Sequence, residues 1–250
     1  MSFLRRSTSN QIRYAVVIVI ILFAFYRLYQ KSPAFLSDHS STVQYAKPIL
    51  PLRTRDSIGA YLENEGFTKG AELGVQQGIF SDQTLTTWPS CEKYYLVDVW
   101  RQQKNYDDGA NVDDSKQEKL FEETQKRLEA YKDKTVFIRK FTSEAVHQIQ
   151  DGELDYVYVD ARHDYCGCMQ DLELYWPKVR DGGIFAGHDY KTAAERPGKD
   201  WGLCQDGTRN EGAVRGAVDD FAAKHDLQVV VTYRDDWNSW MIRKPIMRRV

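Results

Sequence analysis

From residue 54 onward, short apolar runs alternate with segments of helical spacing, and this alternation constrains the fold more than any other feature of the chain. The apolar runs, which have the length of strands, are 69–75, 94–100, 135–141, 154–160, 184–190, 227–233 and 239–245. Helical spacing lies between them, for example at 116–133, 171–181 and 211–225. The pattern predicts an α/β fold, with a doubly wound, mostly parallel sheet of about seven strands and helices on both faces.

A glycine-containing turn follows the first of these strands. Residues 69–78 read KGAELGVQQG, in which Gly74 and Gly78 allow the backbone to turn sharply and to approach a ligand closely, because they lack a Cβ. Free N–H groups at the start of the next helix would face that ligand. About twenty residues later the second strand ends at Asp98, where an acidic residue binds the ribose hydroxyls of a nucleotide-type cofactor. The two features together predict a cofactor site.

Further polar residues follow the fourth and fifth strands, where ligands of a parallel sheet bind. Asp160 and Asp189 end neighbouring strands and are expected to share a divalent cation, for which oxygen ligands favour Mg²⁺. His163 could take a proton from a hydroxyl held beside it. His188 is expected to have a structural or supporting role. Strand-end acids often only cap helices or bind loop amides, and this alternative stays open.

Two other side chains near this position have competing interpretations. Arg162 is expected to pair with Asp164, although an acidic substrate is the alternative. Trp201 lies in the irregular stretch after the fifth strand and could face an acceptor.

Charge is distributed unevenly along the chain. The whole sequence has 34 Lys and Arg against 36 Asp and Glu, yet its first fifty residues contain one acid, Asp38, and six bases. The remainder is therefore net acidic, which argues against nucleic acid as the main partner. Oligomeric state is not indicated.

The N-terminal residues predict a membrane anchor. The domain boundaries expected from the sequence are a short basic cytoplasmic tail at 1–13, a transmembrane signal anchor at 14–29, a stem at 30–53 and the catalytic domain at 54–250. A cleavable signal peptide is the alternative. The excess of basic residues before the predicted anchor over those just after it predicts a single-pass, type II membrane protein of the ER or Golgi with a lumenal catalytic domain.

Four cysteines are too few for a disulfide scaffold. They are Cys91, Cys166, Cys168 and Cys204. Ordinary thiols are the favoured interpretation. The alternatives are one disulfide that involves Cys204, and a metal site.

Six segments, taken in order, resemble class I S-adenosylmethionine-dependent methyltransferases. They are GAELGVQQGIFS, LVDVW, TSEAV, DYVYVDARHDY, DLELYWPKVRDGGIFAGHDY and GAVRGAVDDF. The resemblance is greatest to the branch that includes the macrocin-type sugar O-methyltransferases, and it covers about residues 54–245. It implies a Rossmann-like fold, S-adenosylmethionine as cofactor, and methyl transfer to a hydroxyl of a carbohydrate or another small hydroxylated acceptor.

The resemblance also implies roles for individual residues. The implied cofactor contacts are Glu72, Gly74 and Gly78 at the methionine part, Asp98 at the ribose, Ser143 near the adenine, and Asp160. Asp160 and Asp189 are implied as metal ligands, and His163 as the general base. Two positions depart from the family pattern: Gln76 replaces a glycine, and Arg162 replaces an acid that would add to the metal site.

Two other classes of function remain as alternatives. A lumenal type II glycosyltransferase would fit the anchor and the stem, but no Asp-x-Asp motif follows a suitable strand. A non-catalytic protein with a cofactor-binding fold, acting as a partner or scaffold, would fit the alternation of strands and helices.

Overall fold

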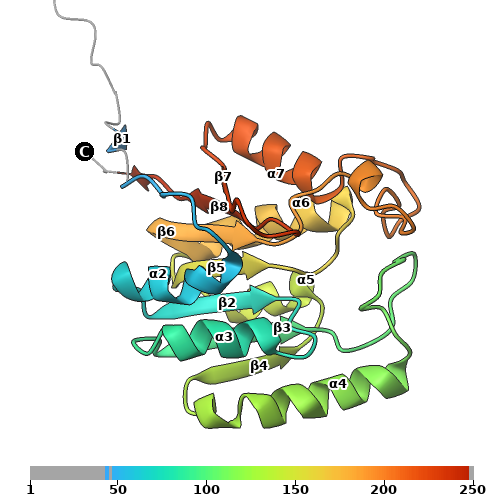
Figure 1. Cartoon of the computed structure of the whole chain (residues 1–250), viewed down its shortest axis with the longest axis horizontal. Helices are drawn as coiled ribbons and strands as arrows, with labels where there is room; N and C mark the ends of the chain where they lie inside the picture. The colour runs from blue at the N-terminus through green and yellow to red at the C-terminus, as the bar shows by residue number, and fades with distance from the viewer. Residues whose placement is uncertain (1–42, 45–46, 248–250) are drawn as a thin grey trace, which may run out of the picture. The chain divides into compact units, whose positions relative to one another are not determined.

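A seven-stranded sheet forms the centre of this computed structural model, which describes residues 43–44 and 47–247 (Figure 1). Its strands, in spatial order, are β4 (Thr135–Arg139), β3 (Lys93–Asp98), β2 (Lys69–Leu73), β5 (Leu154–Val159), β6 (Val179–Gly187), β8 (Trp240–Arg243) and β7 (Val230–Val231). The first five are parallel, β8 runs antiparallel to β6, and β7 runs antiparallel to β8. The prediction of a mostly parallel sheet of about seven strands is confirmed.

Helices cover both faces of the sheet (Figure 1). One face carries α2 (Ile58–Asn64), α3 (Ile79–Thr87) and α4 (Asp114–Arg127), and the other carries α5 (Thr142–Ala145), α6 (Tyr165–Tyr175) and α7 (Ala213–Lys224). Short 3-10 turns adjoin them: η1 (Arg55–Ser57), η2 (Glu129–Tyr131), η3 (Val146–Gln148), η4 (Trp176–Lys178) and η5 (Ala193–Glu195). A small antiparallel pair, β1 (Val43–Gln44) and β9 (Ile246–Met247), joins the two ends of the described chain.

Strand β5 shows how the sequence builds the two cores. Its side chains alternate between the faces, so Val157 and Val159 pack under α6 and α7, while Tyr156 and Tyr158 pack with α2 and α3. All six residues of the strand are buried. A strand covered on both faces reads as an almost unbroken apolar run, which is how it could be identified from sequence.

The order of the strands reverses beside β2. The chain passes from β2 outward to β3 and β4, and then crosses to β5 and β6 on the other side. Because the connections leave β2 and β5 in opposite directions, a crevice opens beyond their carboxyl ends, and this is where doubly wound sheets bind ligands.

One predicted helix is wrong in its bounds. The sequence pattern suggested a helix over 171–181, but α6 ends at Tyr175 and β6 already begins at Val179. The helix begins early because the Asp164 carboxylate accepts a hydrogen bond from the Gly167 N–H at 2.9 Å. It ends early because Pro177 has no N–H to continue it.

The predicted localisation is contradicted. Among residues 43–44 and 47–247, no helix combines the length and apolar character that a membrane span requires. The longest of these, α4, has 14 residues and spans about 21 Å, short of the roughly 30 Å of a bilayer core, and its sequence is highly charged. The predicted placement as a type II membrane protein with a lumenal domain is therefore wrong.

The predicted tail at 1–13 and the predicted anchor at 14–29 lie outside the described residues, as does most of the predicted stem. The described end of the stem packs on the domain: Ile49 is buried with the α2 and α3 core, and the Arg53 carbonyl accepts a hydrogen bond from the Arg234 N–H at 2.9 Å.

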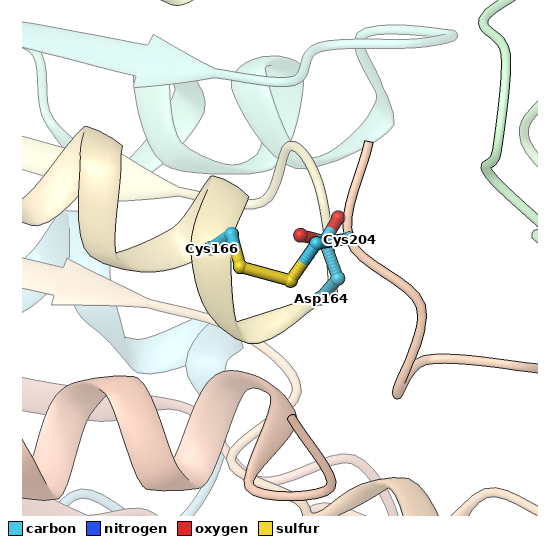
Figure 2. Close-up of side chains that lie close together, drawn as sticks. All are labelled: Asp164, Cys166 and Cys204. Atoms are coloured by element: carbon cyan, nitrogen blue, oxygen red, sulfur yellow. A yellow bond between two sulfur atoms is a disulfide. The ribbon is translucent and has the colours of Figure 1, made fainter. Parts of the chain in front are cut away.

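A disulfide joins Cys166, at the start of α6, to Cys204 in the loop that follows β6 (Figure 2). Cys91 and Cys168 are free and buried. Asp164 lies beside the disulfide, but the two sulfur atoms are bonded to each other and are not available as metal ligands. Of the three interpretations of the cysteines, a disulfide involving Cys204 is the one present, and it ties this loop to α6.

Candidate active site

A cavity of about 550 Å³ lies beyond the carboxyl ends of β2, β3 and β5. This volume is in the range of small-molecule sites. The site residues named from the sequence that line it are Glu72, Gly74, Asp98, Ser143, Asp160 and His163. The other two, Gly78 and Asp189, lie close to the cavity but are not part of its wall.

Strand register brings the polar residues to one level. Leu73 pairs with Val97 on one side and with Val159 on the other. The residues that follow, Gly74, Asp98 and Asp160, are therefore neighbours, although they are distant in sequence. The sequence-based expectation that strand-end residues converge at this edge is confirmed in its geometry.

Gly74 is the point at which the chain passes closest to β5. Its φ is 87°, and a Cβ built there would lie 1.9 Å from the Asp160 carbonyl oxygen. The Gly74 N–H donates to the Val97 carbonyl at 2.8 Å, and the Asp160 N–H donates to the Leu73 carbonyl at 2.7 Å. No residue with a side chain fits between these fixed backbones.

Gly78, unlike Gly74, packs against a neighbouring helix. It precedes α3 with a φ of 67°, and a Cβ there would approach the Thr124 Cγ2 atom to 2.8 Å. The structure thus places Gly78 at the contact between α3 and α4, outside the cavity wall.

Glu72 is a buried acid on the wall of the cavity. Its Oε2 atom accepts hydrogen bonds from the Ser81 hydroxyl at 2.8 Å and the Tyr94 hydroxyl at 3.1 Å. Burial outweighs these bonds and, with the nearby Asp160 charge, raises the pKa of Glu72 to about 8. A cationic group placed in the cavity would favour the ionised form.

Asp98 holds the turn after β2. Its carboxylate accepts hydrogen bonds from the N–H groups of Val75 and Gln76, both at 2.9 Å, and from that of Trp100 at 2.8 Å. Burial raises the pKa of Asp98 in spite of these bonds. The alternative interpretation, a strand-end acid that binds loop amides, therefore describes Asp98, which also faces the cavity.

Asp171, on α6, is a site residue that sequence reasoning missed. It lines the cavity and is 2% exposed, and its Oδ1 atom has no hydrogen-bond partner among the described residues. Burial raises its pKa to about 7. An acid in the middle of a helix normally indicates a solvated surface, so the sequence carried no signal for it.

His163 lies among three carboxylates. Its Nε2 atom is 3.1 Å from Asp189 Oδ2 and 3.4 Å from Asp160 Oδ1, and its Nδ1 atom is 3.1 Å from Asp108 Oδ2. Burial alone would lower the pKa of the imidazole, but the charges of Tyr106 and Asp189 and the hydrogen bonds to Asp108 and Asp160 raise it well above its ordinary value. The histidine sits in the most negative part of the site.

Asp108 and Trp201, from two different loops, complete the surroundings of His163. The Trp201 ring centroid is 4.5 Å from that of His163, and the Trp201 indole N–H donates to Asp108 Oδ2 at 3.1 Å. Burial alone would raise the pKa of Asp108, but the hydrogen bond and charge of His163, with hydrogen bonds from the Ala110 N–H and Trp201, lower it to about 2. No local sequence pattern in this polar loop indicates a role for Asp108.

These two loops, at 101–113 and 199–209, form a roof over the His163 side of the cavity, and we call them the roof loops. The Asn105 side-chain amide donates to the Gln205 carbonyl at 3.0 Å, and Lys199 pairs with Asp107 at 3.1 Å. The disulfide to Cys204 fastens one loop to α6.

Arg162 fastens the other roof loop. It binds the Asn105 carbonyl at 2.8 Å and the Asp164 carboxylate at 2.6 Å, so the predicted pairing of Arg162 with Asp164 is confirmed. Arg162 therefore supports the roof.

A candidate metal site consists of Asp160, His188 and Asp189, whose ligand atoms lie within 4.8 Å of one another. Register explains the presence of His188, because Val159 pairs with Gly187. His188 Nδ1 is 3.3 Å from Asp189 Oδ2. Two carboxylates and an imidazole suit Mn²⁺, Fe²⁺ or Zn²⁺ better than Mg²⁺. The sequence-based expectation of Mg²⁺ considered only the oxygen ligands of Asp160 and Asp189.

Substitution of Gly74 tests the close approach of β2 and β5. We expect Gly74→Ala to cost at least about 3 kcal/mol in the free energy of unfolding, because the clash is with backbone. Gly198→Ala is the matched control: its φ of 81° is similar, but no atom lies within 4 Å of the added Cβ, so about 1–2 kcal/mol is expected. Urea unfolding measures both, and equal losses would contradict the packing argument.

Known proteins share this fold and domain. Residues 71–190 match the model of a methyltransferase domain. An O-methyltransferase from Bacillus cereus, solved in complex with S-adenosylhomocysteine, superposes with a TM-score of 0.53 at 13% identity over 76% of this chain and 80% of that one. An S-adenosylhomocysteine-bound methyltransferase from Podospora anserina gives 0.51 at 14% identity, over 76% and 77%. No curated protein matches the sequence.

These similarities confirm different parts of the sequence-based expectations. The solved structures, at such low identity, confirm the α/β fold. The domain match confirms the prediction of a methyltransferase, and with it the prediction of S-adenosylmethionine as cofactor. The branch of macrocin-type sugar enzymes is not confirmed by any of them.

Proposed function

Proceeding from the methyltransferase domain at residues 71–190, we propose that this chain is an O-methyltransferase that acts on a hydroxyl of a carbohydrate or another small hydroxylated molecule. The observation that supports the choice of oxygen is the position of His163, a histidine set among carboxylates at the wall of the cavity. A neutral hydroxyl is a weak nucleophile and needs a base, whereas a neutral amine does not.

The residues of the cavity fit S-adenosylmethionine. When bound, this cofactor would supply a methyl group on a positively charged sulfur, and the sulfur would leave as the acceptor oxygen bonds to the methyl carbon from the opposite side. Gly74 leaves room against the turn, and the acids Glu72 and Asp160 suit the positive charges of the methionine part. The two solved relatives described above both contain S-adenosylhomocysteine, the product form of the cofactor.

The other end of the cavity suits the nucleoside part. Asp98 would accept hydrogen bonds from the ribose hydroxyls while it holds the turn, and Ser143 would lie near the adenine. The unsatisfied Oδ1 atom of Asp171 offers an acceptor to a donor of the ligand.

His163 would receive the acceptor proton on Nε2, the nitrogen nearer to Asp160 and Asp189. Asp108, bonded to Nδ1, fixes the orientation and the tautomer of the ring. The raised pKa makes the neutral imidazole a strong base, although its neutral fraction is smaller at neutral pH. Trp201 covers the ring and excludes water from that side.

A divalent cation at Asp160 and Asp189, with His188 as a third ligand, is part of the proposal. Such an ion lowers the pKa of a coordinated hydroxyl. The donor set fits a first-row transition ion, and the carboxylates already attract positive charge, since Arg55 and His163 both lie beside Asp160.

The lining of the cavity supports a hydroxylated acceptor. Gln103 and Gln205, from the two roof loops, line it together with Tyr106. The Gln205 side-chain amide makes no hydrogen bond within the described residues, so it is available to a ligand. Sugars are bound by amide and carboxylate side chains that exchange hydrogen bonds with their hydroxyls.

Asp98→Ala tests the cofactor site. We expect the dissociation constant for S-adenosylhomocysteine to rise at least about tenfold in calorimetry, because ribose contacts and the turn are both lost. Asp114→Ala is the control, since it also removes a carboxylate that accepts a loop N–H, from Gln102, but lies outside the cavity wall. Unchanged affinity in Asp98→Ala would refute the assignment.

His163→Asn tests the base. The assay transfers labelled methyl from S-adenosylmethionine to a panel of sugars and phenols, and the best acceptor is then used for kinetics. We expect kcat to fall by about 10²–10⁴, with S-adenosylhomocysteine affinity within a few-fold of the parent protein. If kcat were retained, His163 would not be the base; if only amines accepted methyl, the proposed O-methyl transfer would be wrong.

Metal removal tests the cation site. We expect chelator-treated protein to lose activity and to regain more of it with Mn²⁺ than with Mg²⁺, because one ligand is an imidazole. Electron paramagnetic resonance measures Mn²⁺ binding directly, and Asp189→Asn should weaken it. Full activity in chelator, with no measurable Mn²⁺ binding, would show that no metal takes part.

A further inference from the structure

Arg55 is a cation on the cavity wall to which neither the sequence analysis nor the proposed mechanism gives a role. It is the first residue of η1, and its guanidinium lies 5.2 Å from the centroid of the Phe80 ring. Its Nη1 atom is 3.7 Å from Asp160 Oδ2, which is too long for a hydrogen bond. The Tyr158 hydroxyl is a further polar neighbour of the guanidinium. Most of its five N–H donors therefore remain available to a ligand.

The backbone holds Arg55 in a defined place. The Arg55 N–H donates to Asp235 Oδ2 at 2.9 Å, and two residues earlier the Arg53 carbonyl accepts a hydrogen bond from the Arg234 N–H. The segment before α2 is thus fastened to the loop between β7 and β8, so the position of the guanidinium is built into the fold.

The other cations of the cavity are committed or lie elsewhere. Four positively charged side chains of Lys and Arg line it: Arg55, Arg101, Lys140 and Arg162. Arg162 is bound to Asp164 and to the Asn105 carbonyl. Arg101 stacks over the Phe141 ring at 5.5 Å, next to Lys140 and on the Ser143 side of the cavity. Arg55 alone of the four contacts Asp160 and Phe80, at the end formed by the turn after β2.

The chemistry of the cofactor calls for one cation at that end. The methionine part of S-adenosylmethionine carries an ammonium, a sulfonium and a carboxylate. Glu72 and Asp160 suit the two positive groups, but they would repel the carboxylate. An arginine matches a carboxylate with two parallel hydrogen bonds and keeps its charge at any physiological pH.

We propose that Arg55 binds the α-carboxylate of the methionine part of the cofactor, an inference that rests on the proposed use of S-adenosylmethionine. Arg55 is then a specificity-determining residue, which distinguishes the intact amino-acid end of the cofactor from analogues that lack the carboxylate. It also makes the segment before α2 a part of the cofactor site.

Calorimetry on the full chain tests this with two probes, S-adenosylhomocysteine and its decarboxylated analogue, which retains the amine. We expect the parent protein to bind S-adenosylhomocysteine about tenfold to hundredfold more tightly than the analogue, the range for a charge-assisted hydrogen-bonded pair. In Arg55→Met this preference should disappear, with the affinity for the analogue nearly unchanged. Arg55→Lys should keep part of it. Arg53→Met is the matched control: it removes a charge two residues away, outside the cavity wall, and should keep the full preference.

The outcomes separate this inference from the proposed function. A carboxylate preference that persists in both Arg55→Met and a second variant, Arg55→Gln, would overturn the role of Arg55 while leaving the cofactor assignment intact. The absence of any preference in the parent protein would overturn it as well. If the parent protein bound neither probe, the proposed use of S-adenosylmethionine would itself be wrong. Circular dichroism of each variant confirms that the compared proteins are folded.

Discussion

The contact between Gly74 and the backbone of Asp160 sets the geometry on which the candidate site depends. It brings the turn after β2 against the end of β5, so that a cavity opens between two strand ends with divergent connections. Asp98 completes the contact from the other side by binding the turn's N–H groups. Two acids of the cavity wall, Asp98 and Asp160, are thereby placed by backbone geometry.

Much of this arrangement could be predicted from the sequence, because it follows from regular elements. The period of the apolar runs identified the strands, and the parallel order placed Glu72, Asp98 and Asp160 at one edge of the sheet. The bounds of α6 could not be predicted in this way, since the Asp164 cap and Pro177 outweighed the apolar spacing after Asp171. The membrane placement is contradicted because no helix among the described residues has the length and apolar character of a span.

The residues that sequence reasoning missed share a physical cause. Asp108 lies in an irregular loop and Arg55 in a single 3-10 turn, and both are positioned by contacts with distant loops. Asp171 is an acid on the buried side of a helix. No local pattern encodes such contacts. The role of Arg162 likewise depends on the three-dimensional structure, because its guanidinium supports the loop that carries Asp108. The position of His188 beside the two acids of the candidate metal site is a second example.

The charges of the cavity form a consistent pattern once burial is considered. Burial raises the pKa of Glu72 to about 8 and that of Asp171 to about 7, so these two acids of the cavity wall are partly neutral near physiological pH. A ligand that brings positive charge converts them to carboxylates, and this conversion strengthens its own binding. Arg55 adds the opposite charge at one end. A ligand with an ammonium, a carboxylate and a further fixed positive charge complements both the acids and Arg55. A simple anion such as a nucleoside phosphate would complement Arg55 alone and would oppose the ionisation of both acids.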